Sequence, residues 1–239
     1  MKRDDAGERV YVPIWLFTLY ELASALPTVL IVYWTWSYRG GLAWNGSEQH
    51  FNWHPVLMVT GLIYFTSQSL LAFRLLPCSK ATKKALHVLL HLCSGTCAVI
   101  GLVAVLEFHR RNGHSDFHSL HSWCGLITLA LFTLQFLLGF CAFLFPGFRM
   151  ERRTSFRPIH SVLGLGVFSL AIVTSLIGIN EKIQFINLAS HEDEEMSLEN
   201  VLANSVGLII LFIFCLVFAI LSRKRYKALS QRQGELLLP

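Results

Sequence analysis

The chain has 239 residues, of which 54% are hydrophobic and only 15% are charged, whereas soluble domains carry about 25% charged residues. This composition excludes an ordinary soluble domain and predicts a membrane protein. The formal net charge of +5 would suggest nucleic-acid binding in a soluble protein, but in a membrane protein basic residues first report orientation, so we expect no nucleic-acid partner.

Six apolar segments follow one another along the chain, each long enough to cross a bilayer. A hydrocarbon core about 30 Å thick requires about 20 residues of helix. Lipid admits only helices or closed barrels, and these runs are too long and too uniformly apolar for barrel strands. We therefore predict one all-α domain over residues 1–239, with helices at about 12–36, 53–76, 85–108, 120–145, 158–180 and 201–222 and a tail over 223–239.

Lysine and arginine gather on one side of this predicted bundle. The N-terminus, the second-to-third and fourth-to-fifth connections and the tail hold 16 of the 20 basic residues, and the opposite side holds 4. Cytosolic loops carry the excess of basic residues, so both termini are expected in the cytosol. The glycosylation sequon at Asn45 and the acidic segment 191–196 then lie on the non-cytosolic side.

Four histidines lie near the starts of the four middle helices. The second and fourth helices run towards the cytosol and begin beside His54 and His121, whereas the third and fifth run away from it and begin beside His87 and His160. Ionisable residues in membrane segments are costly and usually functional. The topology therefore predicts one histidine pair near each membrane face, an arrangement suited to two haems that are each held between two imidazoles.

Other interpretations of these histidines remain open. Structural zinc requires four ligands together, which two separated pairs do not provide, but histidines could also relay protons in a haem-free transporter. Two axial histidines leave iron no open position, which favours electron transfer over oxygen activation. His91 lies one turn from His87 on the same helix face, and we expect it to be a neighbour rather than the ligand.

Several motifs in this order resemble the cytochrome b-561 family. They are YRGGLAWNGS (38–47), FNWHPVLM (51–58), KKALHVLLH (83–91), GLVAVLEFH (101–109), SLHSWCG (119–125), RPIH (157–160), GINEK (178–182) and VLANSVG (201–207). The resemblance implies a homodimer of six-helix subunits with two haems b in the middle four helices. It also implies an ascorbate-dependent oxidoreductase whose haem ligands are His54 with His121 and His87 with His160.

The same resemblance suggests the substrates. Electrons are expected to pass from cytosolic ascorbate to ferric iron on the other side, or alternatively to monodehydroascorbate inside a vesicle. The expected location is a lysosomal, late-endosomal or secretory-vesicle membrane, with the plasma membrane as a further possibility. A Tyr-x-x-apolar pattern over residues 226–229 is of the kind read by sorting adaptors.

Cationic residues flank the predicted cytosolic haem. Ascorbate is an anion near neutral pH, so Lys80, Lys84 and Arg153 are its predicted binding residues, and Arg74 is expected to pair with a haem propionate. The alternative is that these cations only set topology and bind lipid phosphates.

On the outer side, the resemblance implies that His109 contacts the acceptor. His114, His118 and Asp116 on the same loop would suit a transition ion; the alternative is a solvated polar loop.

Overall fold

The computed structural model describes residues 14–190 and 197–236, without the side chains of 189, 190 and 223–236. In the described ranges it is all-helical and holds six helical spans long and apolar enough to cross a membrane. This confirms the predicted six-helix membrane bundle. The spans are Ile14–Tyr38, Glu48–Leu75, Lys80–Asn112, Leu120–Phe143, Met150–Leu188 and Leu198–Ser222. The sorting-like pattern at 226–229 and the acidic segment 191–196 lie outside the residues that can be described in full.

Short polar residues and glycine set the ends of the middle helices. Helix α5 (Lys80–Asn112) starts after Ser79, whose hydroxyl accepts a hydrogen bond from the Thr82 N–H, and it ends at Gly113, which adopts φ 70°. Helix α6 (Leu120–Phe143) starts after Ser119, which forms a capping box with Ser122. Such caps satisfy backbone groups that a helix end leaves unpaired. They place His87 and His121 within the first turns of their helices.

The second span is not one regular α-helix. It consists of α2 (Glu48–Phe51), α3 (Trp53–Met58), the π-helical turn η1 (Val59–Phe65) and α4 (Thr66–Leu75). A Cβ at Gly61 in η1 would lie 2.7 Å from the Cβ of Cys97 and 2.9 Å from the carbonyl oxygen of Ser94, both on α5. Glycine is therefore required for the close approach of these two helices. π-Helical turns are rare and occur often at functional sites.

The fifth span is longer than the sequence suggested. Helix α7 (Met150–Ser190) begins eight residues before Pro158 and includes it in its interior, whereas we expected the helix to begin at this proline. Proline removes one intrahelical hydrogen bond, but the helix continues on both sides of it. The fourth-to-fifth connection is correspondingly short.

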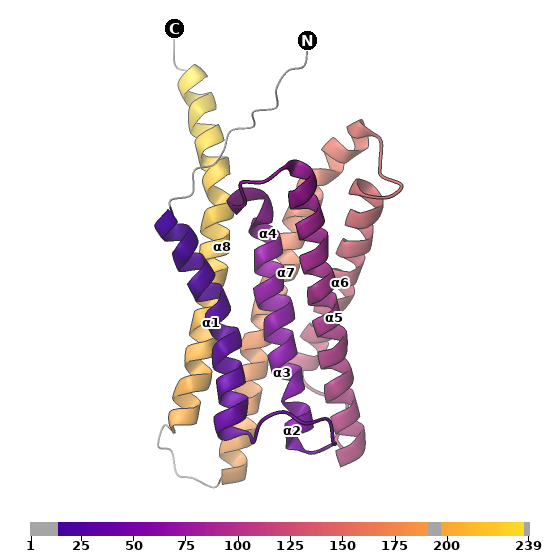
Figure 1. Ribbon diagram of the computed structural model, residues 1–239, viewed down its shortest axis with the longest axis vertical. Helices are drawn as coiled ribbons and strands as arrows, with labels where there is room; N and C mark the ends of the chain where they lie inside the picture. The colour runs from indigo at the N-terminus through magenta and orange to yellow at the C-terminus, as the bar shows by residue number, and fades with distance from the viewer. Residues whose placement is uncertain (1–13, 191–196, 237–239) are drawn as a thin grey trace.

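The helices associate as three antiparallel pairs. The second span packs on α5, α6 packs on α7, and α1 (Ile14–Tyr38) packs on α8 (Leu198–Leu236). In Figure 1, α1 and α8 lie together on one side, and the start of α1 and the end of α8 are at the same end of the bundle. The hydrophobic core lies mainly between α1, the second span, α7 and α8, around Tyr20, Ile63, Phe168 and Ile213.

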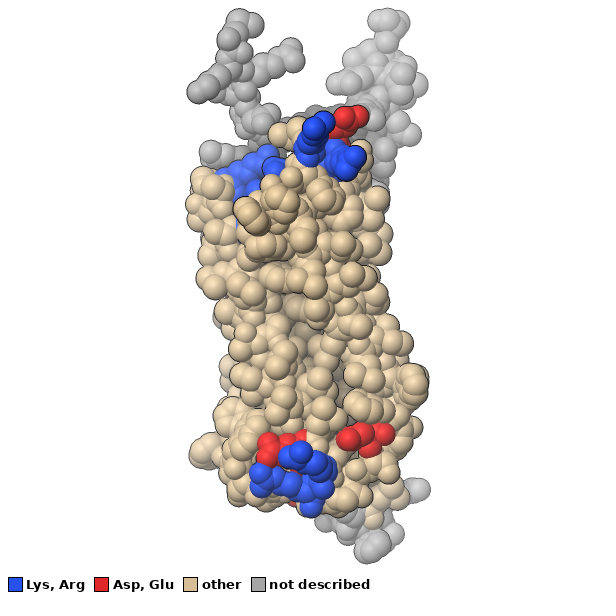
Figure 2. Space-filling view, turned by 90° about the vertical axis from the view of Figure 1, so that its right-hand side faces the viewer, with Lys and Arg blue, Asp and Glu red and all other residues tan. Residues whose placement is uncertain are grey.

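Helices α5 and α6 follow one another in sequence yet touch little, and these two spans are less buried than the others. Figure 2 shows charged atoms at the two ends of the visible face, separated by an uncharged band. The molecule is therefore a multi-pass membrane protein in which α5 and α6 are the least buried spans.

Candidate functional site

The four predicted histidines come together as two pairs. The imidazole rings of His54 and His121 have centroids 6.0 Å apart, and those of His87 and His160 are 6.4 Å apart. Each pair takes one histidine from the hairpin of the second span and α5, and one from the hairpin of α6 and α7. The pairs therefore connect the two hairpins, one near each end of the bundle.

These separations fit a metal ion between two imidazoles. A metal–imidazole nitrogen bond is about 2.0 Å long and the ring centroid lies about 1.2 Å behind the nitrogen, so two rings on opposite sides of one ion have centroids about 6.4 Å apart. Both observed separations agree with this value within 0.4 Å. The histidine pairs thus fit a bis-histidine haem iron at each end.

Backbone carbonyls orient three of these rings. Nδ1 of His54 lies 3.0 Å from the Gly101 carbonyl oxygen, and Nδ1 of His121 lies 3.0 Å from that of Thr174. Nδ1 of His87 lies 2.9 Å from the carbonyl oxygen and 2.8 Å from the hydroxyl of Ser69. A carbonyl oxygen accepts a hydrogen bond only from a protonated Nδ1. The lone pair of the unprotonated Nε2 is then free to bind a metal. Nδ1 of His160 is buried without a hydrogen-bond partner.

Two glycines make room for the rings contributed by α6 and α7. A Cβ at Gly178 of α7 would lie 2.5 Å from Cε1 of His121, and a Cβ at Gly139 of α6 would lie 2.7 Å from Cε1 of His160. The arrangement is reciprocal, because each helix supplies a histidine at one end and a glycine at the other. The other hairpin is also reciprocal. Nδ1 of His54 on α3 contacts a backbone carbonyl of α5, and Nδ1 of His87 on α5 contacts a backbone carbonyl of α4.

His91 is a neighbour of the pair formed by His87 and His160. Its ring lies 4.6 Å from that of His87 and 5.5 Å from that of Phe132. The structure gives its buried Nδ1 no hydrogen-bond partner. The contact with His87 is edge-on and closer than an iron between the two rings would allow, so His87 and His91 do not clamp one ion together.

Comparison with known proteins decides the family. The family model "Eukaryotic cytochrome b561" matches residues 53–186, a range that includes all four paired histidines.

The chain belongs to the eukaryotic cytochrome b561 family.

Named relatives agree with this family. The transmembrane ascorbate-dependent reductase CYB561 of Ovis aries is 41% identical over 205 residues, which cover 85% of this chain and 80% of the relative. The lysosomal membrane ascorbate-dependent ferrireductase CYB561A3 of Homo sapiens is 41% identical over 201 residues, 82% of this chain and 83% of the relative. Its Mus musculus counterpart is 37% identical over 232 residues, 92% and 96% of the two chains. Cytochrome b561 membership implies haem b as cofactor and an oxidoreductase activity.

Two lysines lie beside the pair formed by His87 and His160. Lys84 Nζ donates to the Phe143 carbonyl oxygen at 2.9 Å, and the Phe143 ring lies 5.4 Å from that of His160. Lys83 Nζ donates to the Phe73 carbonyl oxygen at 3.3 Å, and the Phe73 ring lies 5.5 Å from that of His87. The lysines thus hold two of the aromatic residues that flank this pair. Lys83, which sequence analysis did not select, is placed as well as Lys84.

The other predicted cations are less close to the pair. Lys80 is exposed at the start of α5. Arg153 donates from Nε to the Phe148 carbonyl oxygen at 2.6 Å and packs on Gly147, so it holds the connection before α7. Arg74 donates from Nη1 to the Ile220 carbonyl oxygen of α8 at 2.7 Å. Its guanidinium therefore binds α8 in this structure.

At the opposite end, aromatic rings connect the other pair to His109. The Phe51 ring lies 6.1 Å from His54 and 5.5 Å from Phe108, and the Phe108 ring lies 6.1 Å from His109. His109 Nδ1 lies 2.9 Å from the Asp116 carboxylate, and the His114 ring is 5.8 Å from that of His109. His109 is thus held at the end of a short series of rings.

The loop histidines do not assemble into a metal site. Nδ1 of His118 lies 3.0 Å from the Ser115 carbonyl oxygen. In the described part of the chain no three histidine, cysteine or acidic side chains are placed to hold a metal ion. His109, in the last turn of α5, therefore contacts Asp116 and His114 of the loop, whereas the described hydrogen bond of His118 is to Ser115.

Some contributors were missed by the sequence analysis. Ser69, Gly139 and Gly178 carry no chemical signal of their own, since their role depends on which helix faces them. The same is true of Gln135, whose Nε2 donates to the His160 carbonyl oxygen at 2.5 Å.

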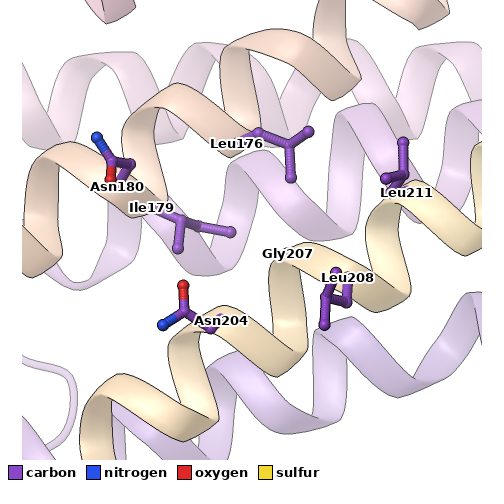
Figure 3. A pocket seen from close by; sticks show the side chains of 7 residues that line it. All are labelled: Leu176, Ile179, Asn180, Asn204, Gly207, Leu208 and Leu211. Carbon is purple, nitrogen blue, oxygen red and sulfur yellow. The ribbon is translucent and has the colours of Figure 1, made fainter. Parts of the chain in front are cut away.

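The described pocket lies elsewhere. It is a groove of about 370 Å³ between α7 and α8, lined by Leu176, Ile179, Asn180, Asn204, Gly207, Leu208 and Leu211. Figure 3 shows the amides of Asn180 and Asn204 at one end of the groove and leucines at the other. No paired histidine lines it, so the candidate site is the pair of histidine clamps and not this groove.

Proposed function

We propose that this protein transfers electrons across a membrane, from ascorbate in the cytosol through two haems b to ferric iron on the other side. The observation that carries the proposal is the two histidine pairs, one near each end of the bundle, with separations of 6.0 and 6.4 Å. His54 with His121 would hold the outer haem, and His87 with His160 the cytosolic one. Bound haem supplies one-electron chemistry, and two axial histidines leave the iron no position for oxygen.

The basic end of the bundle is proposed to face the cytosol. Most of the basic residues with described side chains lie at this end: Arg74, Lys80, Lys83, Lys84, Arg149, Arg152, Arg153 and Arg157. Cytosolic loops carry an excess of basic residues. The exposed Asn45 of the sequon lies at the opposite end, where a glycan could be attached. Both termini would then be cytosolic.

Ascorbate is proposed to bind at the cytosolic end. Lys80, Lys84 and Arg153 present cations to a monoanion, and Lys83 joins them because its ammonium lies beside the aromatic residues that flank the histidine pair. Charge-assisted hydrogen bonds of this kind hold anions more strongly than neutral ones. The ascorbate-dependent relatives support this donor. Arg74 is proposed to pair with a haem propionate through the N–H groups that do not bind the Ile220 carbonyl.

The acceptor is proposed to be ferric iron delivered near His109. The lysosomal ferrireductase relatives support this choice and a lysosomal or late-endosomal membrane. Phe51 and Phe108 provide closely packed rings between His54 and His109. Reduction of monodehydroascorbate inside a vesicle is the alternative acceptor reaction. A homodimer is proposed from family membership.

Sealed vesicles test the proposal. Full-length protein with haem, oriented with its termini inside, should reduce an external ferric chelate when ascorbate is loaded inside. His87→Ala or His54→Ala should remove one haem each and stop the transfer, whereas His91→Ala should keep both haems. Absence of haem in the purified protein, or loss of a haem in His91→Ala but not in His87→Ala, would contradict the assignment. Reduction of monodehydroascorbate without ferric reduction would favour the alternative acceptor.

A further inference from the structure

A carboxylic acid lies inside the membrane bundle at the depth of the cytosolic histidine pair. Glu21 is the one charged residue of α1, seven positions after its start at Ile14, or about 10 Å along the helix axis. Its Oε2 accepts a hydrogen bond from Nε2 of Gln68 at 2.9 Å. The next residue of α4 is Ser69, which binds Nδ1 of His87. Two consecutive residues of α4 therefore contact Glu21 and His87.

Glu21 has polar neighbours but no cation. Nε2 of Gln68 also donates to the Ser24 hydroxyl at 3.1 Å, and the buried Tyr20 hydroxyl has no hydrogen-bond partner in the structure. No Lys, Arg or His with a described side chain lies within ion-pair distance of Glu21. An unpaired carboxylate at membrane depth is costly, and such residues usually have a function.

Among the described side chains, the helices around Glu21 offer no compensating charge. On α1 the titratable neighbour is the phenol of Tyr20, which interacts with Glu21 and with Tyr64 of η1. Helix α8 has no charged residue between Glu199 and Ser222, and its one thiol there, Cys215, is exposed. Arg74 of α4 is bound to the Ile220 carbonyl. The charge on Glu21 is therefore free to respond to a charge added at the histidine pair.

We infer that Glu21 binds one proton when an electron arrives at the cytosolic histidine pair and releases it when the electron leaves, an inference that rests on the proposed function. Ascorbate monoanion gives up one electron and one proton as it becomes monodehydroascorbate. The electron goes to the histidine-held site, and Glu21 takes one proton from cytosolic water. Because charges interact strongly at low dielectric, protonation offsets the added negative charge. No net proton crosses the membrane.

Redox titration of the full-length haem protein in lipid nanodiscs tests this inference. With chemical mediators instead of ascorbate, the midpoint potential of one haem should fall as pH rises from about 5.5 to 8.5. In Glu21→Gln this dependence should be lost for that haem and unchanged for the other. Glu151→Gln, which alters an exposed carboxyl at the same end of the bundle, should keep the dependence.

Infrared difference spectra give a second readout. Reduced-minus-oxidised spectra of the unaltered protein should show a protonated carboxyl band that is absent in Glu21→Gln and shifted in Gln68→Leu, which loses the hydrogen bond. Absence of that band in the unaltered protein would overturn the inference whether or not the variants fold. So would a wild-type pH dependence in Glu21→Gln with both haems bound. A chain without haem would defeat the proposed function, whereas haems that titrate independently of pH would defeat this inference alone.

Discussion

At the scale of single residues, the geometry of the two histidine pairs depends on groups that would not contact a bound haem iron. Carbonyl oxygens of Gly101, Ser69 and Thr174 orient three of the four imidazoles. The positions of Gly139 and Gly178 matter because the rings of His160 and His121 occupy the space that a Cβ would fill. Backbone carbonyls and the two glycines thus define the candidate site as much as the histidines do.

Alanine at either glycine should weaken one haem site selectively. Gly178→Ala should displace His121 and Gly139→Ala should displace His160, because each new Cβ would lie under 3.0 Å from a ring atom. Haem content per chain should fall towards half in both variants, measured by pyridine haemochrome assay. Gly166→Ala on α7 is the control, since nothing lies within 4 Å of its added Cβ. Full haem content in both variants would show that the rings have room to move.

Two histidines at the end of the bundle that holds His54 and His121 allow a matched comparison. His109→Ala should slow reduction of an external ferric chelate, because His109 ends the series of rings from His54 and pairs with Asp116. His118→Ala should change the rate little, since its described hydrogen bond is local, to Ser115. The measurement is the rate of outer haem reoxidation after rapid mixing. Equal rates in the two variants would mean that electrons leave without help from His109.

At the scale of helices, the π-helical turn and Gly61 bring the second span against α5. Gly61→Ala should destabilise the protein, because its Cβ would overlap Cys97 Cβ and the Ser94 carbonyl, and overpacking costs about 1–3 kcal/mol. The expected result is a lower melting temperature in detergent. Gly95→Ala on α5 should have little effect, since its nearest contact would be an ordinary 3.6 Å to Phe132. An unchanged melting temperature for Gly61→Ala would show that η1 adapts.

The sequence predicts the helices better than their contacts. Apolar run length and the position of His54, His87, His121 and His160 near helix starts suffice to predict six spans and two histidine pairs. The π-helical turn and the extension of α7 beyond Pro158 could not be predicted, because both depend on tertiary packing that overrides local preference. Glu21 stood in an apolar run, and only the facing Gln68 shows that it belongs to a polar contact.

At the scale of the whole molecule, the two ends differ in charge. Lys80, Lys84 and Arg153 lie at the end proposed to meet ascorbate. Replacing all three by glutamine should raise the ascorbate KM tenfold or more, because each charge-assisted contact contributes about 1.5–3 kcal/mol. Steady-state reduction by ascorbate at varied concentration measures this.

The controls separate charge from haem loss. Dithionite reduction and both haem spectra should be unchanged in the triple variant. Arg111→Gln at the opposite end, where Arg111 pairs with Glu107, should leave the ascorbate KM unchanged. A triple variant with wild-type ascorbate kinetics would mean that these cations serve topology and lipid binding instead.

The reciprocal construction of the hairpins bears on the direction of current. Each hairpin contributes one histidine to each end, and the α6 and α7 rings are each seated against a glycine of the other helix. The part that the two ends share, one histidine from each hairpin, gives electrons no preferred direction. A preferred direction of electron transfer must therefore come from the features in which the two ends differ. It must also come from the supply of donor and acceptor on each side. Reversing that supply should therefore drive the same molecule backwards.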